Sequence, residues 1–194
     1  MTTGGFGTSR LGETEARLRA RNLRLVLTDC DGVLTDGTVL YTSDGELAKR
    51  FSLRDGMGVE RLRAAGLEAA IVTRERSPIV ERRAAKLGMR LYQDVRDKAE
   101  VLRLLRAEQG FGPGELAYIG DDVNDLPLFE PLAESGLTAA PADAEPAVLA
   151  HAHLRCTRSG GQGAFREFAD WLLALRAGLD HLSLQKTATK GGEP

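Results

Sequence analysis

Two aspartates separated by one residue follow a short apolar run near the start of the chain. The run Leu-Val-Leu-Thr leads directly into Asp29-Cys30-Asp31-Gly32. Carboxylates that leave an apolar segment together are unfavourable unless a cation or strong hydrogen-bond donors offset their charge. An Asp-x-Asp sequence also occurs in ordinary turns. The apolar residues before this pair favour a site that binds a cation.

A second acid pair follows another apolar run. Asp121 and Asp122 come directly after Leu-Ala-Tyr-Ile-Gly. Clustered carboxylate oxygens are hard ligands of the kind that Mg²⁺ prefers. If both runs are strands of one sheet, Asp29 and Asp121 meet at the same edge, and the sequence predicts Mg²⁺ as a cofactor.

Thr73 and Lys98 supply hydrogen-bond donors of the kind that hold phosphate oxygens. Taken singly, Thr73 could be a helix cap, and a lone lysine is usually solvated. Together with the acids they outline a phosphoryl-transfer site. Here Asp29 would attack phosphorus, and Asp31 would protonate the leaving oxygen and later activate water.

Short apolar runs alternate with helical patterns along most of the chain, which is typical of a parallel sheet whose strands are joined by helices. The predicted strands are 23–28, 69–73, 90–93, 116–119, 136–139 and 152–156. The predicted helices are 56–65, 78–87, 98–108, 125–133, 144–150 and 164–177. Ligands of such α/β sheets bind at the carboxyl ends of the strands, where Asp29, Thr73 and Asp121 fall.

Residues 38–52 break the alternation. They flank Ser-Asp-Gly-Glu with apolar residues and predict a β-hairpin after the first strand. Residues 1–20 are predicted to be a flexible arm, 21–182 one folded domain, and 183–194 a flexible tail.

Composition narrows the class of protein. The chain has 194 residues, 42% of them hydrophobic, and a net charge of -2, so it suits one globular domain and does not resemble a nucleic-acid binder. Without a targeting segment or an apolar run long enough to span a membrane, the expected location is the cytoplasm. The two cysteines, Cys30 and Cys156, are predicted to be buried thiols.

The four motifs together resemble those of the haloacid dehalogenase (HAD) superfamily. They are Asp29-Cys30-Asp31-Gly32-Val33-Leu34-Thr35-Asp36-Gly37, Ile71-Val72-Thr73, Lys98, and Gly120-Asp121-Asp122-Val123-Asn124-Asp125. The resemblance implies a three-layer Rossmann-like fold. It also implies Asp29 as nucleophile and metal ligand, Asp31 as acid/base with its carbonyl on the metal, and Asp121 as the other ligand. Asp122 and Asp125 would be supporting acids.

Within that superfamily the chain is similar to the 3-deoxy-D-manno-octulosonate 8-phosphate phosphatase group, which lacks a large cap domain. The similarity lies in the hairpin, in Phe51-Ser52-Leu53-Arg54-Asp55-Gly56 and in the segment 159–167. It implies a sugar-acid phosphate substrate, a homotetramer whose hairpins and tails close neighbouring sites, and a glycine-rich subunit contact at 160–163. The implied substrate-binding residues are Arg54, Asp55, Gly56 and Arg83, with Glu75 as a further contact.

Glu75 and Glu60 depart from the octulosonate pattern, in which arginines are expected near these positions. A carboxylate cannot pair with a sugar-acid carboxylate but accepts hydrogen bonds from hydroxyls or an amide. Glu75 resembles nonulosonate 9-phosphate phosphatases and the phosphatase-like domain of acylneuraminate cytidylyltransferases. These resemblances imply a 2-keto-3-deoxy sugar-acid phosphate as substrate, either octulosonate 8-phosphate or nonulosonate 9-phosphate.

Other functions use similar residues. A phospho-acceptor receiver domain combines strand-end acids, Mg²⁺, Thr and Lys, but places its acid pair first and a lone aspartate later. A phosphoryl mutase would need room for an inserted cap, and a regulatory module of a cytidylyltransferase pathway would not need every motif. His151 and His153 lack further ligands and are expected to be packing or surface residues. The order of the motifs favours the phosphatase.

Overall fold

The centre of the structure is a sheet of buried, mostly parallel strands. The computed structural model describes residues 5–188; residues 1–4 and 189–194 and the side chains of 179–188 lie outside the description. The seven strands lie in the order β1-β9-β8-β7-β2-β5-β6, and only β1 is antiparallel to its neighbour. Their bounds are β1 Thr8–Ser9, β2 Leu25–Thr28, β5 Glu68–Val72, β6 Arg90–Tyr92, β7 Leu116–Ile119, β8 Leu137–Ala140 and β9 Leu154–Arg155.

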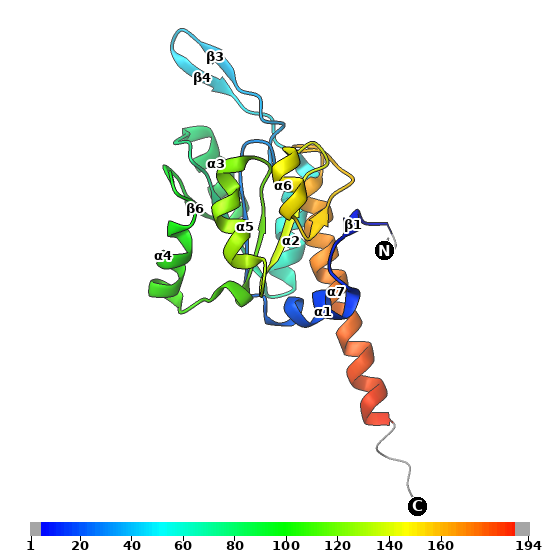
Figure 1. Ribbon diagram of the computed structural model, residues 1–194. Helices are drawn as coiled ribbons and strands as arrows, with labels where there is room; N and C mark the ends of the chain where they lie inside the picture. Colours follow the sequence, from blue (N-terminus) through cyan, green and yellow to red (C-terminus); the bar gives the residue numbers. More distant parts are fainter. Residues whose placement is uncertain (1–4, 189–194) are drawn as a thin grey trace, which may run out of the picture.

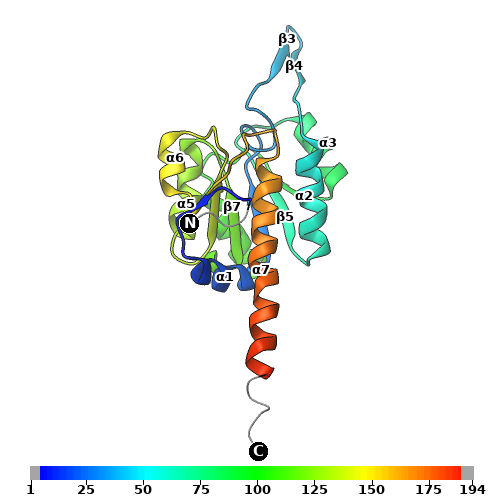
Figure 2. The ribbon, with the colours of Figure 1, turned by 90° about the vertical axis from the view of Figure 1, so that its right-hand side faces the viewer.

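Helices cover both faces of this sheet (Figures 1 and 2). They are α1 Glu13–Asn22, α2 Leu53–Ala64, α3 Pro78–Leu87, α4 Glu100–Gln109, α5 Leu126–Leu132, α6 Pro146–His151 and α7 Ala164–Ala188, with 3₁₀ turns η1 Pro113–Glu115 and η2 Val123–Asp125. Side chains alternate along a strand, so Leu25 and Leu27 pack with α4, α5 and α6, while Val26 packs with α1, α2, α3 and α7. The predicted three-layer α/β fold is confirmed.

Local sequence signals explain the ends of α3, which begins and ends as predicted. Ser77 accepts a hydrogen bond from the Val80 N–H, and Pro78 occupies the first turn, where its missing N–H costs nothing. Gly88 ends the helix with a φ of 62°, a left-handed conformation that glycine adopts without strain. The helix thus begins just after the loop that carries Thr73 and Glu75.

The predicted hairpin is also present. Its strands are β3 (Leu40–Thr42) and β4 (Gly45–Ala48), which pair antiparallel and form a separate two-stranded sheet. Figure 1 shows the hairpin projecting from the body at the end where β2 stops. Leu40, Tyr41 and Leu47 on it are exposed.

The N-terminal segment differs from the predicted arm. Over the described part of residues 1–20, β1 adds a strand to the sheet edge and α1 lies against α7. Ala16 and Ala20 are buried on this helix, and buried Glu167 accepts a hydrogen bond from the Gly7 N–H at 2.9 Å. The arginine-rich composition concealed a helix whose buried face consists of small alanines.

The C-terminal boundary differs too. Helix α7 continues to Ala188, beyond the predicted helix end at 177 and into the predicted tail at 183–194. Figure 2 shows its last turns extending past the body. The rest of that tail, 189–194, lies outside the described residues.

Two further sequence predictions concern the described chain as a whole. Cys30 and Cys156 are free and buried, as predicted. Within residues 5–188, none of the helices has the length and hydropathy that crossing a membrane requires.

Asp55 links α2 to the beginning of α7. Its side chain is buried on α2 and accepts a hydrogen bond from the Arg166 N–H at 2.9 Å, in the first turn of α7. Burial raises the pKa of Asp55 to about 6. A helix cap supplied by another helix stabilises both the helix end and the packing between the two helices.

We predict that Asp55→Ala lowers the free energy of unfolding by about 1–2 kcal/mol, because the first turn of α7 loses its acceptor. Asp55→Asn keeps an acceptor without a buried charge and should cost much less. Urea unfolding followed by circular dichroism measures both. Glu60→Ala, an exposed change on the same helix, is the control. Equal stability of the alanine variant and the wild type would contradict this role.

Candidate active site

The carboxyl ends of three neighbouring strands bring the predicted residues together. Thr28 of β2 pairs with Ile119 of β7 on one side and with Ile71 of β5 on the other. Asp29 is the next residue after Thr28, and its N–H donates to the Ile119 carbonyl at 2.9 Å. Asp121 and Thr73 follow β7 and β5, so parallel pairing places all three at one sheet edge.

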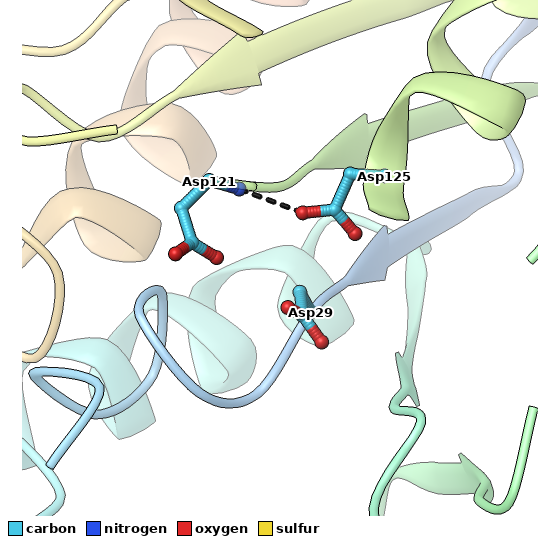
Figure 3. Close-up of side chains that lie close together, drawn as sticks. All are labelled: Asp29, Asp121 and Asp125. Atoms are coloured by element: carbon cyan, nitrogen blue, oxygen red, sulfur yellow. Dashed lines mark hydrogen bonds between the residues drawn. The ribbon is translucent and has the colours of Figure 1, made fainter. Parts of the chain in front are cut away.

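Three carboxylates form a tight cluster at this edge. Ligand oxygens of Asp29, Asp121 and Asp125 lie within 4.8 Å of one another (Figure 3). Burial, followed by the charge of Asp125, raises the pKa of Asp29 to about 7. Burial and the charge of Asp29 raise the pKa of Asp121 to about 8. The positive groups of the protein therefore do not fully offset the negative charge of this carboxylate cluster.

One further observation indicates that the cluster suits a metal ion. Asp121 Oδ1 is buried and has no hydrogen-bond partner. An unpaired buried carboxylate oxygen is costly, and a cation would satisfy it. Within the described residues this is the one group of three or more His, Cys, Asp or Glu side chains close enough to share an ion.

Asp125 is occupied by other partners. Its carboxylate accepts hydrogen bonds from Lys98 Nζ and Tyr118 Oη on one oxygen. The other oxygen accepts the N–H groups of Asp121 and Asp122 at 2.8 and 3.1 Å. Asp125 therefore orients the Asp121 loop and Lys98, and Asp29 and Asp121 are the better candidates for metal ligands.

Lys98 is the buried cation of the cluster. Its side chain is 1% exposed, and Nζ lies 2.9 Å from Asp29 Oδ1 as well as contacting Asp125. Burial alone would lower the pKa of Lys98, but the charges of Asp29 and Asp125 outweigh it and raise the pKa. The predicted phosphate-binding lysine thus touches the predicted nucleophile.

Asp31, the predicted acid/base, has two donors. Lys49 Nζ lies 2.6 Å from its Oδ2, and Thr35 Oγ1 donates to its Oδ1 at 3.2 Å. Gly32, the next residue, has a φ of 94°, and a Cβ there would lie 1.9 Å from Asp121 Oδ2. Only glycine allows the two acidic loops to approach this closely.

The glycine-rich segment at 160–163 packs against the Asp31 loop of the same chain. A Cβ on Gly160 would lie 1.9 Å from the Gly32 carbonyl oxygen, and the Gly161 N–H donates to the Val33 carbonyl at 2.9 Å. Its role as a subunit contact stays a prediction. In this chain it supports the loop that carries Asp31.

Thr73 and Glu75 differ in exposure. Thr73 is buried, and its Oγ1 accepts a hydrogen bond from the Glu75 N–H at 3.2 Å. The Glu75 side chain is exposed in the loop between β5 and α3. Asp122 is also exposed beside the cluster, and its side chain accepts the Val123 N–H at 2.6 Å.

The remaining predicted substrate residues lie around the N-terminus of α2. Arg83 Nη2 donates to the Ser52 carbonyl at 3.1 Å, and its guanidinium lies 5.4 Å from the Phe51 ring centroid. A Cβ on Gly56 would lie 3.1 Å from Arg83 Nη2, so this glycine admits the guanidinium. Arg54 is exposed beside the buried Asp55. The structure gives these residues no contact with the carboxylate cluster.

Sequence reasoning missed Lys49 and Tyr118. A lysine in a polar hairpin carries no local signal, and Tyr118 looks like any core residue of a strand. The two histidines occupy packing and surface positions, as expected. His153 is buried and hydrogen-bonded with Thr138, and burial lowers its pKa to about 4. His151 is exposed at the end of α6.

Comparisons with known proteins agree on one family, although no family model matches the chain. The 3-deoxy-D-manno-octulosonate 8-phosphate phosphatase KdsC of Yersinia pestis is 41% identical over 156 residues, which is 80% of this chain and 82% of the relative. A Legionella pneumophila structure assigned to HAD subfamily III A matches with a TM-score of 0.78 at 38% identity, covering 84% of this chain and 89% of that one.

A further solved structure has a similar fold. It is the 3-deoxy-D-manno-octulosonate 8-phosphate phosphatase of Moraxella catarrhalis in complex with magnesium, phosphate and KDO. Its TM-score is 0.78 at 31% identity, over 89% of this chain and 98% of that chain. Relatives this similar over most of both chains establish kinship, and this chain belongs to the 3-deoxy-D-manno-octulosonate 8-phosphate phosphatase family of HAD-superfamily phosphoric monoester hydrolases.

Proposed function

We propose that this protein hydrolyses the phosphate ester of a 2-keto-3-deoxy sugar acid, with Mg²⁺ as cofactor and Asp29 as nucleophile. The observation that carries the proposal is the contact of Asp29 with buried Lys98, beside the unpaired oxygen of Asp121. The names of the relatives support the substrate class, and the Moraxella complex with magnesium supports the cofactor.

The chain's own residues suit two successive displacements. The Asp29 carboxylate forms a bond to phosphorus as the ester oxygen leaves, and Asp31 gives that oxygen a proton. Water then attacks the aspartyl-phosphate, Asp31 takes a proton from the water, and phosphate leaves from Asp29. Lys98 and Thr73 donate hydrogen bonds to the other phosphoryl oxygens, where negative charge accumulates.

Asp29, Asp121 and the Asp31 carbonyl would hold the metal. When bound, Mg²⁺ would offset the carboxylate charge and withdraw charge from a phosphoryl oxygen. The raised pKa values of Asp29 and Asp121 support a cation at this place, because a cation restores the ionised forms.

Two observations support different lengths of the sugar acid. The related phosphatases are named for the eight-carbon octulosonate 8-phosphate, which makes it the first candidate. The exposed Glu75 makes a nine-carbon nonulosonate 9-phosphate the second, because a glutamate at this position resembles the nonulosonate phosphatases and can accept hydrogen bonds from the hydroxyl or amide groups of the longer sugar.

The test is phosphate release with Mg²⁺ from octulosonate 8-phosphate, nonulosonate 9-phosphates and hexose phosphates. We expect a clear preference for a sugar-acid phosphate over hexose phosphates. Glu75→Arg should shift the preference toward the shorter acid if Glu75 discriminates between them. Equal rates on all three classes would contradict the proposed substrate class.

We also propose that the protein forms a homotetramer in which the hairpin of one chain closes the site of a neighbour, as the family resemblance implies. Tyr41 is 69% exposed and Leu47 is 62% exposed, and such apolar side chains are unfavourable in water. Sedimentation velocity should give a tetramer for the wild type and smaller species for a Tyr41→Ser, Leu47→Ser double variant. A monomeric wild type would remove the proposal.

We predict that asparagine substitutions of Asp29 and Asp31 lower turnover to different extents. Asp29→Asn should abolish turnover, because the amide is a poor nucleophile. Asp31→Asn should lower turnover by about 10²–10⁴ and leave slow or arrested chemistry on Asp29, because only proton transfer is removed. Phosphate release and intact-protein mass spectrometry measure the two effects, and full activity in either variant would exclude the mechanism.

For the metal site we predict opposite effects of Asp121→Asn on stability and on metal binding. A carboxyl whose folded pKa is raised binds protons more tightly in the folded state. The metal-free wild type therefore loses stability as pH rises from about 4 to about 8. Without metal at pH 8, Asp121→Asn should raise the melting temperature by about 2–4 °C, equivalent to about 1 kcal/mol.

Mg²⁺ should stabilise the wild type and not Asp121→Asn, because the variant lacks a ligand. Differential scanning calorimetry with EDTA or with Mg²⁺ gives both values. Asp122→Asn is the matched control, since this neighbour is exposed and asparagine also caps a helix. Equal stabilisation of both variants by Mg²⁺ would exclude Asp121 as a ligand.

A further inference from the structure

Lys49 connects the hairpin to Asp31. It directly follows Ala48, the last residue of β4, and so lies at the base of the hairpin. Its side chain is only 1% exposed, and Nζ lies 2.6 Å from Asp31 Oδ2 and 3.3 Å from Glu46 Oε1. A buried lysine between two carboxylates differs from the usual solvated lysine of a hairpin.

Lys49 and Thr35 together hold both oxygens of the Asp31 carboxylate. Thr35 is fully buried, and its hydroxyl donates to Oδ1 at 3.2 Å, while Lys49 donates to Oδ2. One donor would leave the carboxylate free to rotate about its terminal torsion, which is broad in aspartate. Two donors on different oxygens define the plane of the group.

The base of the hairpin is itself attached to the body of the protein. Glu46, on β4, accepts a hydrogen bond from Ser77 Oγ as well as pairing with Lys49. Ser77 is buried and caps the N-terminus of α3. A continuous chain of polar contacts therefore runs from Asp31 through Lys49 and Glu46 to a fixed helix end.

We infer that Lys49 is a positioning residue for Asp31, so that the base of the hairpin sets the direction of proton transfer to the leaving group. The inference rests on the proposed role of Asp31 as acid/base. A general acid must lie within hydrogen-bond reach of the leaving oxygen, and a small misplacement lowers the rate strongly. If Lys49 instead bound the phosphate directly, its removal would lower the rate for every phosphate ester, whatever the leaving group.

Leaving groups of different basicity separate the two roles. A sugar or simple alkyl phosphate expels a basic alkoxide that needs a proton, whereas 4-nitrophenyl phosphate expels a stable anion. The ratio kcat/KM reports steps up to departure of the leaving group. We expect Lys49→Met to lower kcat/KM by about 10–100-fold on the alkyl substrate and by less than about threefold on the aryl substrate.

Three further variants make the result specific. Lys49→Arg keeps a cationic donor and should recover most of the alkyl activity. Thr35→Val removes the other donor at nearly constant volume and should show the same dependence on the leaving group. Arg50→Met is the matched control. Arg50 follows Lys49, is 75% exposed and pairs with Asp36, so its loss should not change kcat/KM on the alkyl or the aryl substrate.

The outcomes are distinct. Equal losses on both substrates for Lys49→Met, or no loss on either, overturn the inference. A loss confined to the alkyl substrate, with recovery by arginine, supports it. A wild type that hydrolyses alkyl phosphates but no sugar-acid phosphate contradicts the proposed substrate class alone, because the comparison of leaving groups can still be made with the alkyl substrate.

Discussion

Mutual repulsion among three closely spaced carboxylates, two of them on buried residues, is the constraint on which this site depends. Parallel pairing of β2 with β7 forces Asp29 and Asp121 to the same edge, and the turn after β7 adds Asp125. In a water-poor environment such charges cannot be left without partners. Lys98 offsets part of the charge, and Tyr118 and two backbone N–H groups stabilise Asp125.

This arrangement separates two kinds of acid. Each carboxylate oxygen of Asp125 accepts two hydrogen bonds, so this residue orients the groups around it. Asp29 and Asp121 retain strongly raised pKa values, and Asp121 keeps an oxygen without a partner. Asp125, whose hydrogen bonds are all made, thus orients the site, while Asp29 and Asp121 remain available to bind a cation or react. Glycines at 32 and 160 let the supporting loops come close enough to fix this geometry.

The sequence allowed the sheet, the hairpin and the approach of Asp29, Thr73 and Asp121 to be predicted, because strand-end positions follow from hydrophobic periodicity. It did not reveal the contact between Lys49 and Asp31, which depends on how the hairpin folds back at its base. Helix α1 was missed because its buried face is made of alanines among arginines. The substrate-binding role of Asp55 stays a prediction, and its hydrogen bond to the Arg166 N–H was missed because it depends on the packing of α2 against α7.

The two-residue strand β1 has a consequence for how copies of this chain meet. It is the edge strand beside β9, and because it is only two residues long it offers little unpaired backbone to another molecule. Open edges favour indiscriminate strand addition, whereas the exposed apolar side chains of the hairpin favour contacts chosen by shape. The short edge strand therefore limits nonspecific strand addition at one end of the sheet, while the hairpin leaves a selective surface available elsewhere.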